Sequence, residues 1–375
     1  MTRPAAARPG PGVSQALTIR SVEAVLVVVP MRRALGTSAM GMAEAPLVLI
    51  DLHTDEGVTG RAYLFCYLES AGHAVIDLTR DISTVLAGTA ASPAAARQAL
   101  GERFTLLGAR GLVSAVLAAV DVACWDALAM AAGLPLARML GATLRPAAAY
   151  NSNGLGLLAP QACATEAQEL VAEGFRAIKM RLGRPRGHDD LAAVKAVRAA
   201  IPADVVLMAD YNQALSPRAA RERCRQLDDE GLYWIEEPVR HDDYAASAEL
   251  AALLATPVQI GENFAGPGAM SLALRQHASD LVMADLDRIG GVSGWLQAAA
   301  LADVAAVELS SHLYPEVSAH LLAATPTAHW IEYVDWAAPI LEQPLPVDGG
   351  YVAPPDRPGN GLTWNADAVA HYRRA

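Results

Sequence analysis

The feature that most constrains the fold is a repeat in the second half of the chain, where short apolar runs alternate with alanine-rich amphipathic segments after Pro146. Short apolar runs separated by segments of helical length are typical of parallel strands joined by helices. Eight such runs predict a (β/α) barrel. The predicted strands are residues 148–152, 177–181, 205–210, 234–236, 258–261, 281–284, 307–310 and 330–333.

The first part of the chain has a different pattern of strand-like and helical segments, and this pattern predicts a separate α+β domain. Three strand-like runs (18–29, 47–53 and 60–64) are followed by a helical region that includes a buried helix over 112–132. A barrel of about 250 residues plus a smaller domain accounts for the 375 residues. The predicted division is a disordered tail (1–15), a capping domain (16–145), a barrel (146–348) and a C-terminal segment that packs back on the capping domain (349–375).

The charge and the cysteine content limit which kinds of partner and which cellular compartment are expected. The net charge of -11 and the absence of long Lys/Arg runs argue against nucleic acid as a partner. The four cysteines are scattered along the chain without a C-x-x-C pair, which is typical of reduced thiols. We therefore expect a cytoplasmic protein. Asp121 and Asp126 interrupt the most apolar stretch, so a membrane span is not expected. A small-molecule substrate remains the expected partner.

A polar residue ends or soon follows each predicted barrel strand. From Lys179 onward these residues are spaced by 20 to 31 positions, about one strand, loop and helix. A barrel gathers the carboxyl ends of its strands at one mouth, so these side chains are expected to converge there. They are Ser152, Lys179 and Arg181, Asp210 and Asn212, Glu236, Glu262, Asp285, His312 and Glu332.

Three of these residues, Asp210, Glu236 and Glu262, follow adjacent predicted strands. Carboxylates are the hard oxygen donors that Mg²⁺ prefers. Taken singly, each acid is more often a surface residue or a helix cap, but the regular spacing favours a shared Mg²⁺ site. His312 and Asp285 follow neighbouring strands, an arrangement in which a carboxylate orients an imidazole that acts as a base.

Several segments resemble the mandelate racemase family of the enolase superfamily, over most of the chain from about residue 45 to 354. The matching segments are 208–213 (MADYNQ), 234–238 (WIEEP), 259–263 (QIGEN), 288–292 (RIGGV), 310–313 (SSHL) and 318–330. The resemblance implies an N-terminal α+β capping domain over a (β/α)₇β barrel of the TIM type. It also implies an enzyme that removes a proton α to a carboxylate with Mg²⁺ as cofactor, and a homo-oligomer, an octamer in the family.

The resemblance also implies a role for each residue at the mouth. Asp210, Glu236 and Glu262 would ligate Mg²⁺, and His312 with Asp285 would be the base on one face of the substrate. Glu332 would be a protonated acid on the substrate carboxylate, Lys179 a cation on that carboxylate, and Asn212 and Ser152 polar contacts to substrate oxygens.

One residue departs from the family pattern. Arg181 stands where mandelate racemase has a second lysine, the base on the opposite face. An arginine side chain has an ordinary pKa of about 13, so its neutral form costs about 8 kcal/mol at pH 7. Three readings stay open: Arg181 stabilises charge beside a one-base site, shuttles the proton slowly, or only pairs with a metal-ligand carboxylate.

The positions that match the family's specificity loops are nearly all apolar. They are Leu35, Met42, Phe65, Tyr67, Leu106, Leu313 and Val334, some of which can equally be core residues. Such a pocket suits an aryl or alkyl group better than the hydroxyls of a sugar acid. The leading hypothesis is a racemase-like isomerase of an apolar 2-hydroxy acid. The alternatives are a hydroxy-acid dehydratase with His312 as its single base, and a non-catalytic binding protein that keeps the metal site.

Overall fold

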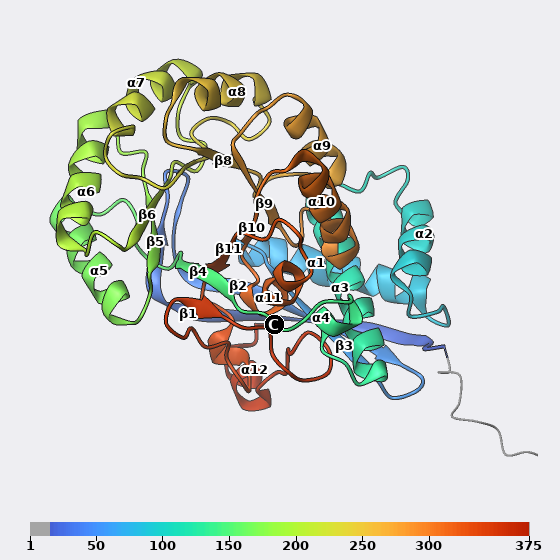
Figure 1. Cartoon of the computed structure of the whole chain (residues 1–375). Coiled ribbons are helices and arrows are strands. Elements are labelled where there is room, and N and C mark those ends of the chain that lie inside the picture. The colour runs from blue at the N-terminus through green and yellow to red at the C-terminus, as the bar shows by residue number, and fades with distance from the viewer. Residues whose placement is uncertain (1–15, 375) are drawn as a thin grey trace, which may run out of the picture.

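The computed structural model describes residues 16–374. Within them the chain forms a three-stranded antiparallel sheet with its helices, followed by a ring of parallel strands (Figure 1). The tail predicted over residues 1–15 lies outside the described residues.

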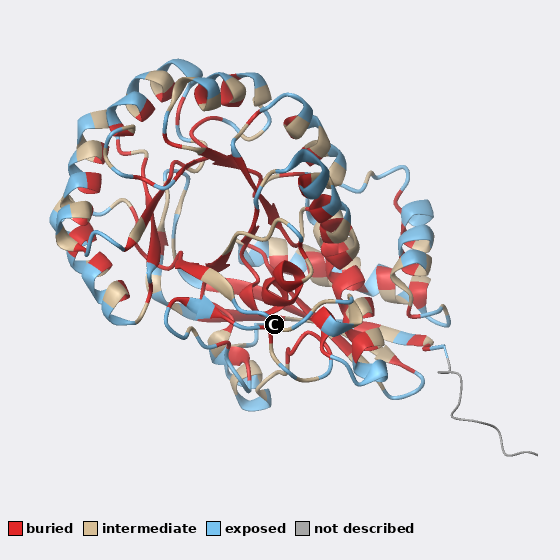
Figure 2. Ribbon diagram, viewed as in Figure 1, coloured by how far each residue is buried: buried red, intermediate tan, exposed pale blue. Residues whose placement is uncertain are grey.

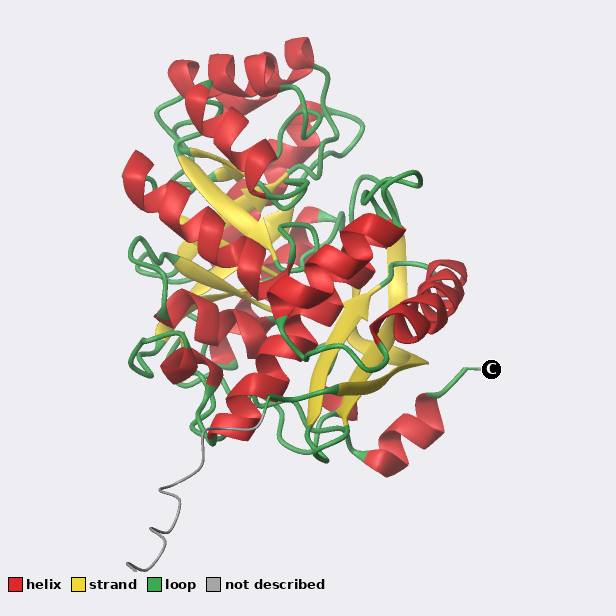
Figure 3. Ribbon diagram, turned by 90° about the vertical axis from the view of Figure 1, so that its right-hand side faces the viewer, coloured by secondary structure: helices red, strands yellow, loops and turns green. Residues whose placement is uncertain are grey.

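The capping domain is a strand meander followed by helices. Its strands β1 (Ile19–Gly36), β2 (Gly41–Thr54) and β3 (Thr59–Phe65) pair in chain order, and a turn at 55–57 joins the last two. Its helices are α1 (Glu69–Leu86), α2 (Pro93–Arg103), α3 (Leu112–Ala132) and α4 (Leu136–Met139). The sheet lies beside the barrel with helices packed against it (Figure 3).

Helix α3 is the predicted buried helix, and its bounds agree with the prediction. It is long and apolar enough to cross a membrane by composition, but 61% of its most apolar window is buried inside the protein. It packs between β3 of the capping domain and α10 (Gly291–Ala305) of the barrel. The contact with β3 is so close that a Cβ at Gly60 would lie 1.9 Å from the carbonyl oxygen of Ala123, so only glycine is accommodated there.

The barrel has eight parallel strands with seven helices between them, the (β/α)₇β arrangement. The strands are β4 (Ala147–Asn151), β5 (Ala177–Arg181), β6 (Val206–Asp210), β7 (Ile235–Glu236), β8 (Val258–Ile260), β9 (Leu281–Asp285), β10 (Leu309–His312) and β11 (Trp330–Tyr333). The helices are α5 (Pro160–Ala172), α6 (Gly187–Ala200), α7 (Pro217–Leu227), α8 (Tyr244–Leu253), α9 (Pro267–Arg275), α10 and α11 (Pro315–Ala323).

The strands form a buried ring. Each pairs with its neighbour in chain order from β4 to β10, β11 pairs with β4, and β10 lies against β11 to close the circle. Every residue of β5 and of β9 is buried, because helices cover the outside of the ring and side chains fill its inside (Figure 2). Helices α5 to α10 expose their outer faces to solvent.

Two local differences from the predicted strands matter for the site. Strand β1 continues past Pro30 to Gly36, because its pairing with β2 resumes after a register shift between Pro30 and Leu35. This extension carries the hairpin tip to the barrel, where Ser38 Oγ donates to the carbonyl of Tyr211 (3.1 Å). Strand β10 runs to His312, so the histidine ends the strand instead of following it.

The C-terminal segment connects the two domains. Strand β12 (Tyr351–Val352) pairs antiparallel with β4 of the barrel, whereas α12 (Ala366–Tyr372) lies against β1 and the short 3₁₀ helix η1 (Ala338–Ile340). Trp364 Nε1 donates to Asp51 Oδ1 of the capping sheet (2.8 Å). The segment predicted to pack on the first domain therefore contacts both domains.

Candidate active site

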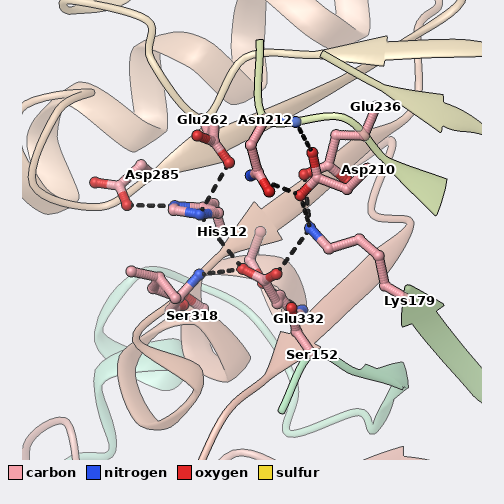
Figure 4. Close-up of polar contacts among 12 residues, drawn as sticks. Ser152, Lys179, Asp210, Asn212, Glu236, Glu262, Asp285, His312, Ser318 and Glu332 are labelled. Carbon is pink, nitrogen blue, oxygen red and sulfur yellow. Dashed lines mark hydrogen bonds and ion pairs between the residues drawn. The ribbon is translucent and has the colours of Figure 1, made fainter. Parts of the chain in front are cut away.

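The polar residues that the sequence places after successive strands meet at one end of the barrel. Figure 4 shows their side chains pointing toward one another from strands on different sides of the ring. All of these acidic and basic side chains are buried, with no more than 8% of any residue exposed. Buried charges of both signs at the carboxyl ends of barrel strands are typical of a catalytic site.

Three carboxylates form the centre of this cluster. Asp210 ends β6, Glu236 ends β7, and Glu262 lies two residues after β8. One oxygen from each lies within 4.8 Å of the others. The predicted Mg²⁺ ligands are therefore brought together.

The charge balance of the cluster suits a divalent cation. Five carboxylates (Asp210, Glu236, Glu262, Asp285 and Glu332) face three potential cations (Lys179, Arg181 and His312). Burial raises the pKa of Glu236 to about 8; Lys179 opposes the rise, while Asp210 and Glu332 add to it. The hard oxygen donors and the surplus of negative charge both fit Mg²⁺.

Lys179 is held on the metal-ligand side of the cluster. Its Nζ lies 2.6 Å from Glu236 Oε1, 3.0 Å from Glu332 Oε1 and 3.4 Å from Asp210 Oδ2. Burial alone would lower the pKa of Lys179, but these carboxylates raise it well above its usual value. These contacts favour the cationic form of the side chain, and its expected contact with a substrate carboxylate stays a prediction.

His312 and Asp285 form the predicted pair on the other side of the cluster. His312 Nδ1 donates to Asp285 Oδ2 (2.6 Å), while Nε2 faces Glu262 Oε2 at 3.2 Å and Glu332 Oε2 at 3.7 Å. Burial opposes the charged ring, but Glu332, Glu262 and Asp285 raise the pKa of His312 well above its usual value. Asp285 fixes which ring nitrogen is directed to the cluster.

Glu332 is expected to be a protonated acid on the substrate carboxylate, and in this arrangement it lies between two cationic side chains. Burial raises its pKa, but Lys179, His312 and Arg181 outweigh burial and hold the pKa of Glu332 well below its usual range. Its Oε2 also accepts a hydrogen bond from the Leu313 backbone N–H (2.8 Å), which favours the carboxylate. Lys179 and His312 both reach Glu332, and its role as a protonated acid toward a substrate stays a prediction.

Arg181 and Ser152 contact each other. The Nη2 of Arg181 donates to Ser152 Oγ (2.8 Å) and its Nη1 donates to the Ser152 carbonyl (3.2 Å). Arg181 Nε lies 3.9 Å from Asp210 Oδ2, a long ion pair with one metal-ligand carboxylate. Two of the guanidinium N–H groups are thus committed to Ser152.

Asn212 supports the metal-ligand residue Asp210. Its backbone N–H donates to Asp210 Oδ1 (2.7 Å) and its Nδ2 donates to Oδ2 (3.0 Å). Its backbone is left-handed (φ 44°), a conformation that non-glycine residues rarely adopt. Within residues 16–374 the side-chain oxygen of Asn212 has no hydrogen-bond partner, so it is able to accept a hydrogen bond from a ligand.

Most of the predicted pocket residues lie on segments that reach this end of the barrel. Leu35 and Met42 pair across the β1–β2 hairpin, next to the tip that contacts β6. Leu313 directly follows His312. Phe65 ends β3, and its ring centre lies 4.4 Å from that of Tyr67. Val334 follows β11 and is buried.

Leu106 does not belong to this set. It lies in the connection between α2 and α3, and its side chain is fully exposed. The prediction that it lines the pocket is wrong, because that connection stays on the surface of the capping domain.

Sequence reasoning missed several residues of the site. Trp336, six per cent exposed, stacks on Phe65 with ring centres 4.7 Å apart, and its aromatic type beside β11 was the available signal. Arg288 and Asn263 hydrogen-bond around Glu262, although only their motifs were noted. Glu316, four residues after His312, accepts a hydrogen bond from Tyr63 Oη (2.7 Å).

Family comparisons agree with this geometry. Residues 162–368 match the enolase C-terminal domain-like family, and residues 19–141 match the mandelate racemase / muconate lactonizing enzyme N-terminal domain. The chain belongs to the enolase superfamily. Its fold, (β/α)₇β barrel and capping domain together, is the one that the sequence predicted.

Solved enolase-superfamily structures resemble the whole chain. An enolase from the alphaproteobacterium BAL199 with bound Mg is 44% identical, with a TM-score of 0.93, over 96% of this chain and 100% of the other. An enolase from Bradyrhizobium complexed with magnesium and mandelic acid is 40% identical, with a TM-score of 0.91, over 97% and 100%. Magnesium in such relatives and the Asp210–Glu236–Glu262 cluster identify Mg²⁺ as the cofactor of this superfamily member.

Curated relatives are enzymes of more than one reaction type. The L-talarate/galactarate dehydratase of Salmonella typhimurium is 34% identical over 263 residues, which span 70% of this chain and 66% of that enzyme. Other relatives, 26–30% identical, are sugar-acid dehydratases, cycloisomerases and epimerases. This superfamily member is therefore an enzyme of Mg²⁺-dependent proton abstraction from a carboxylic acid.

Proposed function

We propose that this enzyme removes the α proton of a 2-hydroxy acid with an apolar or aromatic substituent, and acts as a mandelate racemase-like isomerase. The observation that carries the proposal is the His312–Asp285 pair, whose Nε2 faces the carboxylate cluster at 3.2 Å from Glu262. A histidine oriented in this way is suited to proton transfer at a substrate held by the metal ligands.

The chain's own residues divide the chemistry between them. His312 Nε2 accepts the α proton when its ring is neutral, while Asp285 holds Nδ1–H and stabilises the imidazolium that forms. Lys179 supplies a fixed positive charge beside Glu236 and Glu332, where negative charge develops on the substrate carboxylate. When bound, Mg²⁺ supplies Lewis-acid stabilisation of the same charge.

The apolar walls support a mandelate-like substrate. Leu35, Phe65, Leu313 and Val334 are buried apolar side chains on the segments around the mouth, and Trp336 adds a second aromatic ring. Apart from the indole N–H of Trp336, these side chains offer no hydrogen bonds to the hydroxyls of a sugar acid, which would be costly to bury unpaired. The mandelic acid complex of the Bradyrhizobium relative points the same way.

Elimination of water is the second candidate function. It is favoured by the dehydratases among the relatives and by the replacement of a second base with Arg181. In that reaction His312 would remove the α proton and then return it to the leaving hydroxyl. Racemisation needs a proton donor on each face of the carbanion, and in the isomerase Arg181 would be the slow donor on the second face, whereas elimination needs one residue on one face.

A substrate screen tests the proposal. Mandelate and branched 2-hydroxy acids are incubated with Mg²⁺ in D₂O beside galactarate, talarate and gluconate, and α-hydrogen exchange, inversion and keto-acid formation are followed by NMR. Exchange of the apolar acids with a kcat/KM at least about tenfold above the sugar acids is expected. A sugar acid converted to a keto acid as the best substrate would replace the isomerase with the hydro-lyase.

A further inference from the structure

Arg288 is the centre of a contact network outside the set of reacting residues. It lies in the turn that follows β9, and its Nη1 donates to the Glu262 carbonyl (3.2 Å) and to Asn263 Oδ1. Its Nη2 donates to Tyr67 Oη (3.3 Å), and the guanidinium carbon lies 5.8 Å from the centre of the Tyr67 ring. One side chain thus joins the turns after β8 and β9 to a loop of the capping domain.

Tyr67 occupies a conformation that needs such a partner. It lies in the loop between β3 and α1, and its backbone is left-handed (φ 60°) although it is not glycine. A bulky residue in this region stores strain of about 1–3 kcal/mol, which persists only where tertiary contacts hold it. Stacking on Phe65 and the contacts with Arg288 are the contacts that hold the Tyr67 ring.

Asn263 extends the network to a metal-ligand side chain. Its Nδ2 donates to Glu262 Oε1 (3.0 Å) and to Glu237 Oε2 (2.9 Å), while its Oδ1 accepts from Arg288. A continuous path of hydrogen bonds therefore runs from Tyr67 through Arg288 and Asn263 to the carboxylate of Glu262. Separately, the Arg288 backbone N–H donates to Asp285 Oδ1 (3.1 Å), the acid that holds His312.

The network borders open space on the capping side. A cavity of about 430 Å³ is lined by Tyr67, Asn263 and Arg288 together with His241 and apolar residues of β3 and α3. The loop after β3 is therefore held to the barrel on this side mainly by specific contacts, and less by continuous packing.

We propose that Tyr67, Arg288 and Asn263 form a latch that fixes the capping loop onto the barrel and, through the same hydrogen bonds, orients Glu262 for Mg²⁺. All three are positioning residues, because they act on the site through Glu262. Docking of the loop and affinity for the metal are then linked: each strengthens the other by the same factor.

Two conservative variants and their combination test this latch. Tyr67→Phe keeps the ring and its stacking but removes the hydroxyl, and Arg288→Lys keeps the charge but loses the fork that spans three acceptors. Tyr233→Phe is the matched control: Tyr233 lies just before β7, and its hydroxyl contacts His329, just before β11, at the end of the barrel opposite the mouth. Thermal unfolding of each variant shows that it is folded.

Two readouts need no substrate. Calorimetric titration with Mg²⁺ alone is expected to give a Kd raised about tenfold in each single variant, the lower end of the usual effect of changing a partner of a metal ligand. Amide hydrogen exchange of residues 64–70, measured with Mg²⁺ present, is expected to quicken in both variants. The Tyr233→Phe control is expected to match the native protein in both readouts.

The double variant decides whether the residues act as a unit. If they do, Tyr67→Phe adds little to Arg288→Lys, because the hydrogen bond between them is already lost. Unchanged Mg²⁺ affinity in both single variants, or effects that simply add in the double variant, would overturn the latch. Because neither readout uses a substrate, failure of the mandelate-like activity would leave this result standing, and failure of the latch would leave that activity untouched.

Discussion

The two sides of the active site both present nitrogen-bearing side chains to the carboxylates, but they differ in the chemistry that those side chains can perform. On one side Lys179 and Arg181 end β5, and on the other Asp285 and His312 end β9 and β10. Each side presents a buried nitrogen base or cation toward the same carboxylates. The difference lies in the second partner of each group: His312 has a carboxylate behind it, whereas Arg181 has a hydroxyl and a carbonyl of Ser152.

That difference separates proton transfer from charge stabilisation. A histidine becomes neutral near its working pH once the surrounding negative charge is balanced, so it can accept a proton. Neutral arginine costs about 8 kcal/mol at pH 7 from its ordinary acidity, and neutral lysine about 5 kcal/mol. The contacts of Lys179 with three carboxylates move it further from the neutral form. We therefore expect one side to exchange protons and the other to hold charge.

The largest effect is expected from a change in the metal-ligand cluster, on which proton transfer from either side depends. Replacing Glu236 with Gln takes away one of three clustered carboxylates, and it should weaken Mg²⁺ binding by more than about 100-fold and abolish exchange from either face. Calorimetry measures the first and NMR in D₂O the second. Glu249→Gln, an exposed acid paired with Arg221 on the barrel surface, is the control. Unchanged Mg²⁺ affinity in Glu236→Gln would remove that residue from the metal site.

The next effect should be confined to one side. His312→Asn keeps a polar side chain next to Asp285 but removes the proton acceptor, so exchange of the enantiomer whose α hydrogen faces His312 should fall by about 10²–10⁴. Mg²⁺ affinity should change far less, since the three carboxylates remain. Exchange at the native rate in this variant would show that His312 is not the base.

Changing the other side should sharpen the contrast. Arg181→Lys lowers the cost of a neutral side chain by about 3 kcal/mol, and it should raise inversion relative to exchange from the His312 face by at least about tenfold. Chiral analysis alongside deuterium incorporation measures that ratio. In the native enzyme, exchange should run ahead of inversion for the His312-facing enantiomer, with the other enantiomer nearly inert. Equal exchange of both enantiomers would make Arg181 a competent base.

The smallest effect concerns the pH dependence of folding stability. It must be known before a change of activity with pH is attributed to the active site. His320 of α11 is buried away from the site, where its Nδ1 accepts from the Ala137 N–H (3.2 Å), and burial lowers its pKa from 6.5 to about 4. A depressed folded pKa stabilises the fold fully above pH 6.5 and loses that contribution as the pH falls toward 4. The loss is worth about 3 kcal/mol.

The measurement compares two proteins, because buried Glu316, whose pKa burial raises to about 7, titrates with the opposite sign in the same range. The stability advantage of the native protein over His320→Gln, from urea unfolding, should shrink by about 3 kcal/mol between pH 7 and pH 4. A constant advantage across that range would mean that His320 is not held neutral in the fold.

Much of the scaffold could be read from local sequence. The bounds of β5, β11 and α3 agree with the predicted ranges, and the other barrel strands differ by one or two residues at their ends. The reason is that barrel strands are continuous apolar runs and that α3 is apolar on nearly every side. The residue types of these segments therefore predict their burial. Strand β1 was predicted too short because the pairing beyond Pro30 depends on β2.

The sequence by itself determined which residues meet at the mouth of the barrel, because in a parallel barrel the end of every strand lies at the same edge. It could not decide their protonation. The lowered pKa of Glu332 follows from Lys179 and His312, which lie 153 and 20 positions away in the sequence. Charge states are set by distances between elements, and those exist only in the folded chain.

Tertiary structure alone also decided the second layer of the site. Leu106 and Phe65 are both apolar residues of the capping domain, yet one is fully exposed and the other stacks on Trp336, some 270 positions later. Tyr67 and Arg288 join only because the loop after β3 lands beside the turn after β9. A periodic pattern fixes which face of an element is buried, whereas contacts between loops depend on how whole domains dock, and no local pattern encodes that.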